Sequence, residues 1–226
     1  MASAGNLIGS AVADPDREFA FSDEDFKTLS KLAYEHAGIV LAESKRNLIY
    51  GRLSRRLRAL GMTTFRDYRA YLMGDGGASE MQNFINSIST NLTKFFRESH
   101  HFDNFRSSVV VPYATGRGRN SRRLRIWSAG CSTGEEPYTI AVILQKEMND
   151  VARHDVRILA TDIDTDVLGK AARGEYPANS VDEDVPKAYR SYFESAKGER
   201  GPIVRSRSAG SRQIGRHGYG EVTGVA

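Results

Sequence analysis

The chain has 226 residues, of which 40% are hydrophobic and 27% charged, a composition typical of a globular protein with one or two domains. Its formal net charge is only +4, and its single cysteine excludes an intramolecular disulfide and favours a reducing compartment. No apolar run approaches the length of a membrane span, and residues 1–18 lack the features of a signal peptide, so we expect a cytoplasmic protein.

The N-terminal part predicts a mobile tail followed by a helical bundle. Residues 1–18 are small and polar. Ser22 and Asp25 then form a capping-box pattern, and apolar residues at helical spacing continue to Gly38. Three further helices are expected, over the ranges Ser44–Gly61, Thr64–Gly74 and Ser79–Ile88.

The second of these helices carries basic residues along one side. Lys45, Arg52 and Arg56 fall on one stripe beside the apolar face, with Arg55 next to it. The stripe is either a solvated basic face or an electrostatic docking surface for an acidic partner. No DNA-binding motif or aromatic platform supports nucleic acid as that partner.

The bundle is followed by a linker, residues 90–123. Asn91 and Thr93 are short polar residues that either cap neighbouring helices or contact a ligand. His100–His101 has no third metal ligand at suitable spacing, so no metal site is expected. Residues 102–113 are expected to form a helix or an extended segment, and residues 116–123 an exposed loop.

A strand, a small-residue loop and a helix organise the second half of the chain. Leu124–Ser128 predicts a strand, the loop contains Gly130 and Gly134, and Glu136 opens an apolar helix. A second strand, Val156–Thr161, ends at Asp162-Ile163-Asp164, and a helix ending at Gly174 is expected to follow. The order strand, loop, helix and strand is the one with which α/β folds bind nucleotide-like ligands. An acidic residue after the second strand then accepts hydrogen bonds from the ribose hydroxyls.

The residues of the loop restrict the class of ligand that it can bind. It has neither Gly-Lys-Ser/Thr nor Gly-x-Gly-x-x-Gly, and Glu135 and Glu136 would repel a phosphate. They suit a ligand that is cationic or rich in hydroxyls and amines, such as an adenosine that carries a sulfonium and an amino acid. A βαβ unit without a ligand is the alternative. No base is placed beside Cys131, so we expect it to line the loop as a small residue.

Three segments carry a family resemblance: Ser89–Glu98, Ile126–Tyr138 and Ala160–Asp164. In this order and spacing they strongly resemble the CheR-type chemotaxis receptor methyltransferases, over roughly residues 20–205. The resemblance implies an α/β protein, in which a small N-terminal helical bundle precedes a partial class I methyltransferase fold. It also implies an enzyme that methylates glutamate side chains of chemoreceptors with S-adenosylmethionine.

Carried over by motif position, the resemblance assigns the cofactor contacts. They are expected at Asn91, Thr93, Arg97, Ala129, Glu135 and Asp162. Arg97 is also the catalytic candidate, because its guanidinium can form paired hydrogen bonds with a carboxylate, either that of the cofactor or that of the incoming glutamate. Asp162 is the expected ribose partner. Helix capping by Asp162 and stabilisation of a helix N-terminus by Glu135 are the structural alternatives.

The helical domain of the family docks the acidic, glutamate-bearing helical bundle of the receptor, which favours docking as the role of Lys45, Arg52, Arg55 and Arg56. Neither nucleic acid nor membrane insertion is expected. The resemblance divides the chain into a tail (1–18), a docking domain (19–89), a linker with cofactor contacts (90–123), a partial methyltransferase domain (124–205) and an aberrant disordered tail (206–226).

The resemblance ends near residue 205. Val185–Phe193 is expected to form the family's next helix, but from Arg205 to Gly220 the chain is dominated by Gly, Ser and Arg and predicts no strand. Only two strands are then expected in the parallel sheet, and we expect a truncated or frame-shifted product. The chain is thus expected to be a protein-glutamate O-methyltransferase or, alternatively, an inactive receptor-binding module.

Overall fold

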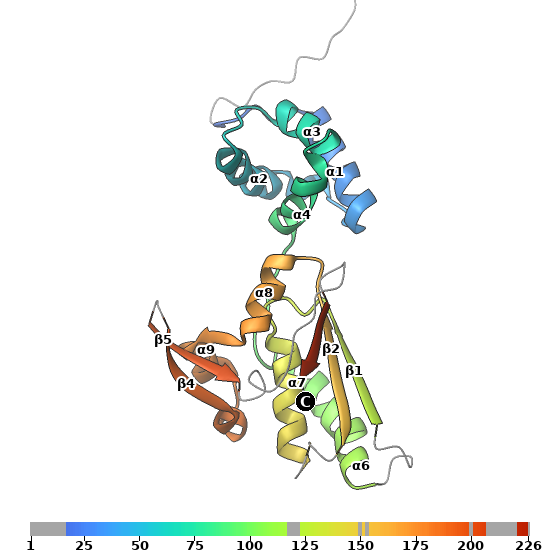
Figure 1. Cartoon of the computed structure of the whole chain (residues 1–226), viewed down its shortest axis with the longest axis vertical. Helices are drawn as coiled ribbons and strands as arrows, with labels where there is room; N and C mark the ends of the chain where they lie inside the picture. The colour runs from blue at the N-terminus through green and yellow to red at the C-terminus, as the bar shows by residue number, and fades with distance from the viewer. Residues whose placement is uncertain are drawn as a thin grey trace, which may run out of the picture. The chain divides into compact units, whose positions relative to one another are not determined.

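The structure, a computed structural model, describes residues 17–116, 123–148, 151, 154–198, 201–206 and 221–225. The chain divides into two compact units, Met1–Ser89 and Thr90–Ala226 (Figure 1). The expected mobile tail lies outside the described residues except at Arg17 and Glu18. None of the helices in the described ranges is long and apolar enough to cross a membrane.

The first unit is helical, and its four predicted helices are confirmed. Its elements are α1 (Asp23–Ala37), the short 3-10 helix η1 (Glu43–Lys45), α2 (Arg46–Leu60), α3 (Phe65–Met73) and α4 (Gly77–Ile88). The capping box of α1 forms as predicted. The backbone N–H of Ser22 donates to the Asp25 carboxylate at 2.8 Å, and the backbone N–H of Asp25 donates to the Ser22 hydroxyl at 3.1 Å. Each helix turns one apolar side to a shared core, which includes Leu29, Ile49, Leu53, Phe65 and Phe84.

The second unit is built on the predicted strand, loop and helix. Strands β1 (Arg123–Ala129) and β2 (Asp155–Thr161) are parallel, with Ile126 opposite Ile158. Helix α7 (Glu135–Glu147) connects them, and α8 (Thr165–Arg173) follows β2. Because α7 is apolar along residues 137–144, it is buried there in the main core of the unit.

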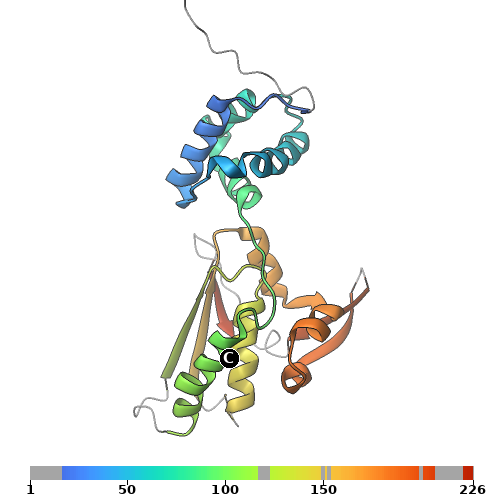
Figure 2. The same ribbon diagram turned by 180° about the vertical axis from the view of Figure 1, so that it is seen from behind.

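The stretch Ser99–Ala114, which precedes β1 in the second unit, is helical. Helix α5 (Ser99–Phe105) continues through a π-helical turn, η2 (Arg106–Val110), into α6 (Val111–Ala114). Val110 and the rings of Phe102 and Phe105 join the core that α7 forms with β1 and β2. The helical segment runs beside α7 (Figure 2). Of the two predictions for residues 102–113, the helix is therefore confirmed and the extended segment is wrong. Residues 117–122 of the expected loop are outside the described part of the chain.

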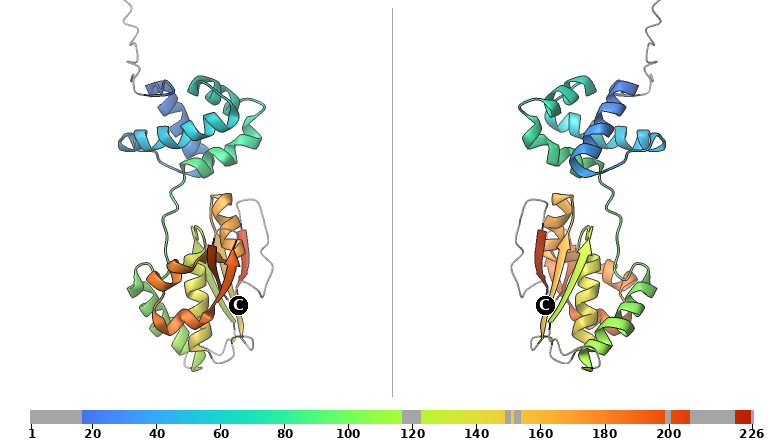
Figure 3. Two further views of the ribbon diagram at one scale, coloured as in Figure 1. Left: turned by 90° about the vertical axis from the view of Figure 1, so that its left-hand side faces the viewer. Right: turned by 90° about the vertical axis from the view of Figure 1, so that its right-hand side faces the viewer.

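The second unit also contains an antiparallel sheet that the sequence patterns did not predict. It has the order β3-β5-β4, formed by β3 (Glu175–Pro177), β4 (Phe193–Gly198) and β5 (Gly201–Ser206). The helix expected over Val185–Phe193 is present only as a six-residue 3-10 helix, η4 (Lys187–Tyr192), which leads directly into β4. Helix α9 (Ala178–Asp184) precedes it, and α7 lies between the two sheets (Figures 1 and 3).

The expectation of a two-stranded sheet and a strandless tail is also wrong. Strand β6 (Glu221–Val225) pairs antiparallel with β2, giving the order β1-β2-β6. The β-branched residues Val222, Thr223 and Val225 suit a strand, but the surrounding Gly, Ser and Arg conceal them in a compositional reading. Residues 207–220 and Ala226 are outside the described ranges.

Candidate functional site

The candidate site lies where the loops after β1 and β2 meet. The backbone N–H groups of Gly130 and Cys131 donate to the carbonyl of Thr161 at 2.8 and 2.9 Å. These bonds hold the loop Gly130–Gly134 against the carboxyl end of β2. Parallel strands place their carboxyl ends at one edge, which is where open α/β sheets bind ligands.

Asp162 joins the two loops. Its Oδ2 accepts from the backbone N–H of Ser132 at 2.7 Å, and its Oδ1 accepts from that of Asp164 at 2.9 Å. The predicted alternative, a helix cap at Asp162, is wrong, because Asp164 is the N-cap of α8. A carboxylate has about four lone-pair sites. The two backbone bonds therefore leave Asp162 able to accept from further donors, such as ribose hydroxyls.

The two acidic residues at the start of α7 have different surroundings. Glu135 is half-buried, and its Oε2 accepts from the hydroxyl of Thr133 at 2.6 Å. Glu136 is exposed and accepts from the hydroxyl of Ser128 at 2.6 Å. Both carboxylates lie in the first turn of α7, where the helix dipole favours negative charge. The structural role considered for Glu135 is therefore present, and it is compatible with ligand contact.

The loop glycines have distinct roles. Both have positive φ, 76° at Gly130 and 100° at Gly134. A Cβ on Gly134 would lie 2.7 Å from the Tyr176 hydroxyl and 2.9 Å from the Ala171 Cβ, so packing requires a glycine there. A Cβ on Gly130 would meet nothing within 4 Å. Gly130 therefore borders open space in which a ligand can approach the backbone closely.

The segment Asn91–Arg97 is attached to both loops at its first residue. The Nδ2 of Asn91 donates to Oδ2 of Asp164 at 2.5 Å, and the hydroxyl of Ser132 donates to the Asn91 carbonyl at 2.9 Å. The structure thus brings Asn91, Glu135 and Asp162 to neighbouring loops. Ser132 and Asp164 were not predicted as site residues, and only the polar pair in Asp-Ile-Asp hinted at the second.

Aromatic packing fixes the other end of this segment. Phe95 is 1% exposed and makes edge contacts with Tyr176 and Phe193, at centroid distances of 4.8 and 5.2 Å. The backbone N–H of Phe96, which has a positive φ of 52°, donates to the hydroxyl of Thr139 at 3.2 Å. Phe95 therefore anchors the downstream end of the segment in the core.

The remaining predicted cofactor contacts, Arg97, Thr93 and Ala129, are exposed or half-buried. Arg97 is exposed, and its Nη1 donates to the carbonyl of Leu92 at 2.8 Å, folding the side chain back over its own segment. Thr93 is half-buried, and Ala129 is exposed at the end of β1.

Cys131 is buried in the loop after β1. Its burial, together with the nearby charge of Asp162, raises the pKa of its thiol to about 12. The thiol therefore stays protonated at neutral pH, in keeping with a residue that lines the loop.

Two of the four basic residues predicted for docking are engaged inside the helical unit. Arg56 makes a bidentate pair with the buried Glu80, with both N–O distances 2.5 Å, and Tyr68 also donates to Glu80. Arg52 donates to the carbonyls of Ile88 and Ser89 at 2.6 and 2.8 Å, closing the end of α4. Lys45 and Arg55 are exposed.

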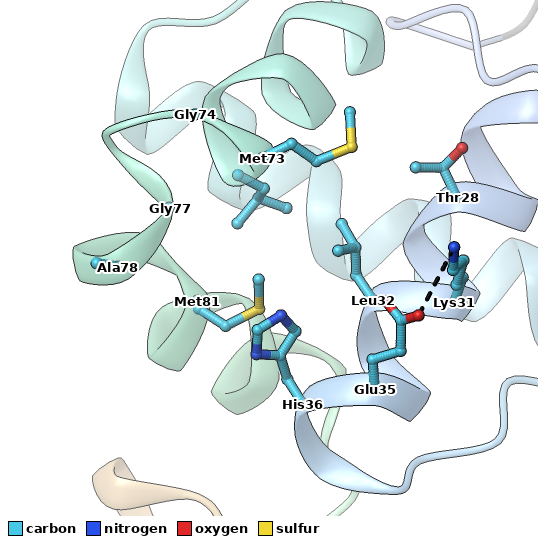
Figure 4. A pocket seen from close by; sticks show the side chains of 11 residues that line it. Thr28, Lys31, Leu32, Glu35, His36, Met73, Gly74, Gly77, Ala78 and Met81 are labelled. Carbon is cyan, nitrogen blue, oxygen red and sulfur yellow. Dashed lines mark ion pairs between the residues drawn. The ribbon is translucent and has the colours of Figure 1, made fainter.

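The helical unit also contains a cavity of about 770 Å³ between α1, α3 and α4 (Figure 4). Leu32, Met73 and Met81 line its apolar part, and Lys31, Glu35 and His36 its polar part. None of the predicted site residues lines this cavity. Within the described ranges, no group of three or more His, Cys, Asp or Glu side chains could hold a metal ion.

Comparison with known proteins gives two adjacent family matches. Residues 24–89 match the family described as CheR methyltransferase, all-alpha domain, and residues 91–207 match CheR methyltransferase, SAM binding domain. A chemotaxis protein methyltransferase of Escherichia coli K12 is 43% identical over 83% of this chain, and one of Klebsiella aerogenes is 41% identical over 91%. The chain spans 63% of the first relative's length and 68% of the second's.

Proposed function

Because this chain belongs to the CheR methyltransferase family, we propose that it binds S-adenosylmethionine and transfers the methyl group to glutamate side chains of chemotaxis receptors. The observation that carries the proposal is that hydrogen bonds join the segment of Asn91 and the loop of Asp162 to the loop after β1, which leads into α7 at Glu135. Two of these side chains are carboxylates, and phosphate-binding signatures are absent from the loop sequence.

The residues present fit this cofactor. It carries a sulfonium and an ammonium, which favour an acidic site, and ribose hydroxyls, which favour carboxylate acceptors. Glu135 and Asp162 supply the carboxylates, and Gly130 borders open space for close approach to the backbone. When bound, the cofactor supplies an electrophilic methyl group.

Each predicted residue then has a chemical task. Asp162 would accept from the ribose hydroxyls, Glu135 would face the cationic part of the ligand, and Asn91, Thr93 and Ala129 would line the site. Arg97 would bind a carboxylate, either that of the cofactor or that of the incoming glutamate. An ionised glutamate is itself the nucleophile, so the protein contributes mainly positioning and exclusion of water.

For the receptor we propose a cytoplasmic, acidic helical bundle that bears the substrate glutamates and docks on α2. Exposed Lys45 and Arg55 support this surface. Arg52 and Arg56, although engaged in internal hydrogen bonds, are still half-exposed and add to its positive potential. A receptor-binding module without catalysis is the alternative, which the separate core of the helical unit favours.

The test is methyl transfer from labelled S-adenosylmethionine to receptor cytoplasmic fragments by the purified 226-residue chain. The proposal predicts alkali-labile label on receptor glutamates, as expected of methyl esters. Binding of the receptor without any transfer would instead support the module.

A further inference from the structure

The carboxylate of Asp164 has a separate task for each oxygen. The residue is buried, with 3% of its surface exposed. Its Oδ1 accepts from the backbone N–H groups of Asp166 and Val167 at 2.9 and 3.3 Å, which caps α8. Its Oδ2 accepts from Nδ2 of Asn91 at 2.5 Å, across 73 residues of sequence.

These bonds belong to a closed ring of four residues. Asn91 accepts from the Ser132 hydroxyl through its carbonyl, and the Ser132 N–H donates to Asp162. Asp162 in turn accepts from the backbone N–H of Asp164. The ring spans the segment before α5, the loop after β1 and the loop after β2. Without the Asn91–Asp164 bond, the ring would hold the segment before α5 to these loops only through the Asn91 carbonyl and the Ser132 hydroxyl.

The segment that the ring holds has little regular structure of its own. Residues 89–94 are neither helix nor strand, and the side chain of Leu92 is 79% exposed. Phe95 anchors the segment downstream, while Asn91 fixes it upstream. A buried hydrogen bond to a charged acceptor is stronger than one between neutral groups, so the bond to Asp164 is well suited to this task.

We propose that Asp164 is a positioning residue that holds Asn91–Arg97 against the loops after β1 and β2. The inference rests on the proposed function in so far as this segment contacts S-adenosylmethionine. Asp164 itself acts through Asn91.

The test uses Asp164→Asn in the full chain. Asparagine caps helices as well as aspartate does, so α8 keeps its cap, but its amide then faces the amide of Asn91. We expect the Kd for S-adenosylhomocysteine to rise roughly tenfold, in line with the loss of one charge-assisted hydrogen bond. Asp166→Asn is the matched control, because it removes the same charge from the same helical turn and should leave the Kd unchanged.

Rescue separates positioning from a general loss of stability. The double variant Asn91→Asp, Asp164→Asn restores the bond with donor and acceptor exchanged, and should return the segment to its wild-type position. Because Asn91 itself is proposed to line the site, the rescue is judged by hydrogen exchange of the segment, and wild-type affinity in Asp164→Asn would overturn the inference.

Hydrogen exchange decides the inference without ligand. Backbone amides of residues 91–97 should exchange faster in Asp164→Asn and return to the wild-type rate in the double variant. Failure of the wild-type chain to bind the ligand would contradict the proposed function alone. Unchanged exchange in Asp164→Asn would contradict this inference alone.

Discussion

The phenol of Tyr176 donates a 2.8 Å hydrogen bond to the backbone carbonyl of Thr133. This bond joins β3 of the antiparallel sheet to the loop between β1 and α7. Tyr176 also lies against Gly134 and makes an edge contact with Phe95. One buried side chain thus supports both the loop and the segment proposed to hold the cofactor.

We therefore expect Tyr176→Phe to destabilise the second unit by about 1 to 2 kcal/mol, because a backbone carbonyl loses its donor inside the protein. The ring and its packing are retained. Urea unfolding followed by near-UV circular dichroism measures the change. Tyr192→Phe is the control, because its ring is only half-buried, and it should unfold at the wild-type urea concentration.

The two loop glycines should respond differently to alanine. At Gly134 the added Cβ would overlap Tyr176 and Ala171, and the left-handed backbone adds strain, so we expect a loss of about 2 to 4 kcal/mol. At Gly130 only the backbone strain applies, about 1 kcal/mol. Thermal unfolding of both variants measures the difference, and equal losses would contradict the packing role of Gly134.

The pair Arg56–Glu80 predicts a pH-dependent stability of the helical unit. Burial alone would raise the pKa of Glu80, but hydrogen bonds from Arg56, Asn83 and Tyr68 outweigh it and lower the pKa below its ordinary value of 4.5. A group with a depressed folded pKa stabilises the fold above its unfolded pKa, and that contribution is lost as the pH falls through the folded pKa. Stability should therefore decrease on acidification below about pH 4.5.

Glu80→Gln tests this account. At pH 7 it should cost about 2 to 4 kcal/mol, because Arg56 loses its charged partner, and the acid-dependent loss should become smaller. Glu24→Gln is the control, because Glu24 is an exposed partner of Arg69 and its removal should cost less than about 1 kcal/mol. An acid profile that Glu80→Gln leaves unchanged would show that other carboxylates dominate it.

Charge reversal at Arg55 of α2 and at Lys45, the N-cap residue of that helix, should separate docking from folding. Lys45→Glu with Arg55→Glu should weaken association with an acidic receptor fragment by roughly tenfold or more at low salt, with less effect at high salt. Unfolding should change little, because both side chains are exposed. Surface plasmon resonance at two salt concentrations measures the association, and wild-type affinity would show that the receptor docks elsewhere.

Local patterns predicted the elements that position the site. Helical spacing with caps predicted α1 to α4, and the run from Leu124 to Leu144 predicted β1, the loop and α7, because each signal lies within one turn or strand. The Gly- and Ser-rich composition concealed β6, since strand pairing with β2 is decided by residues far apart in the chain.

The same distinction applies to the site. Asn91, Glu135 and Asp162 were predicted from motifs, and the structure joins the segment of Asn91 and the loop of Asp162 to the loop that leads into α7 at Glu135. The roles of Ser132 and Asp164 depend on partners 41 and 73 residues away, which no local pattern indicates. The hydrogen bonds of Arg52 and Arg56 within the helical unit could not be predicted either, because the spacing of basic residues along a helix does not indicate which of them face another helix.

The most direct test of the central claim is a calorimetric titration of the purified chain with S-adenosylhomocysteine. The account predicts saturable binding that Asp162→Ala and Arg97→Ala each abolish, while Glu136→Gln, at the adjacent exposed carboxylate, binds as the wild type does. Far-UV circular dichroism of each variant confirms that the fold is retained. No binding by the wild-type chain, or unchanged affinity in both alanine variants, would contradict the proposed cofactor site.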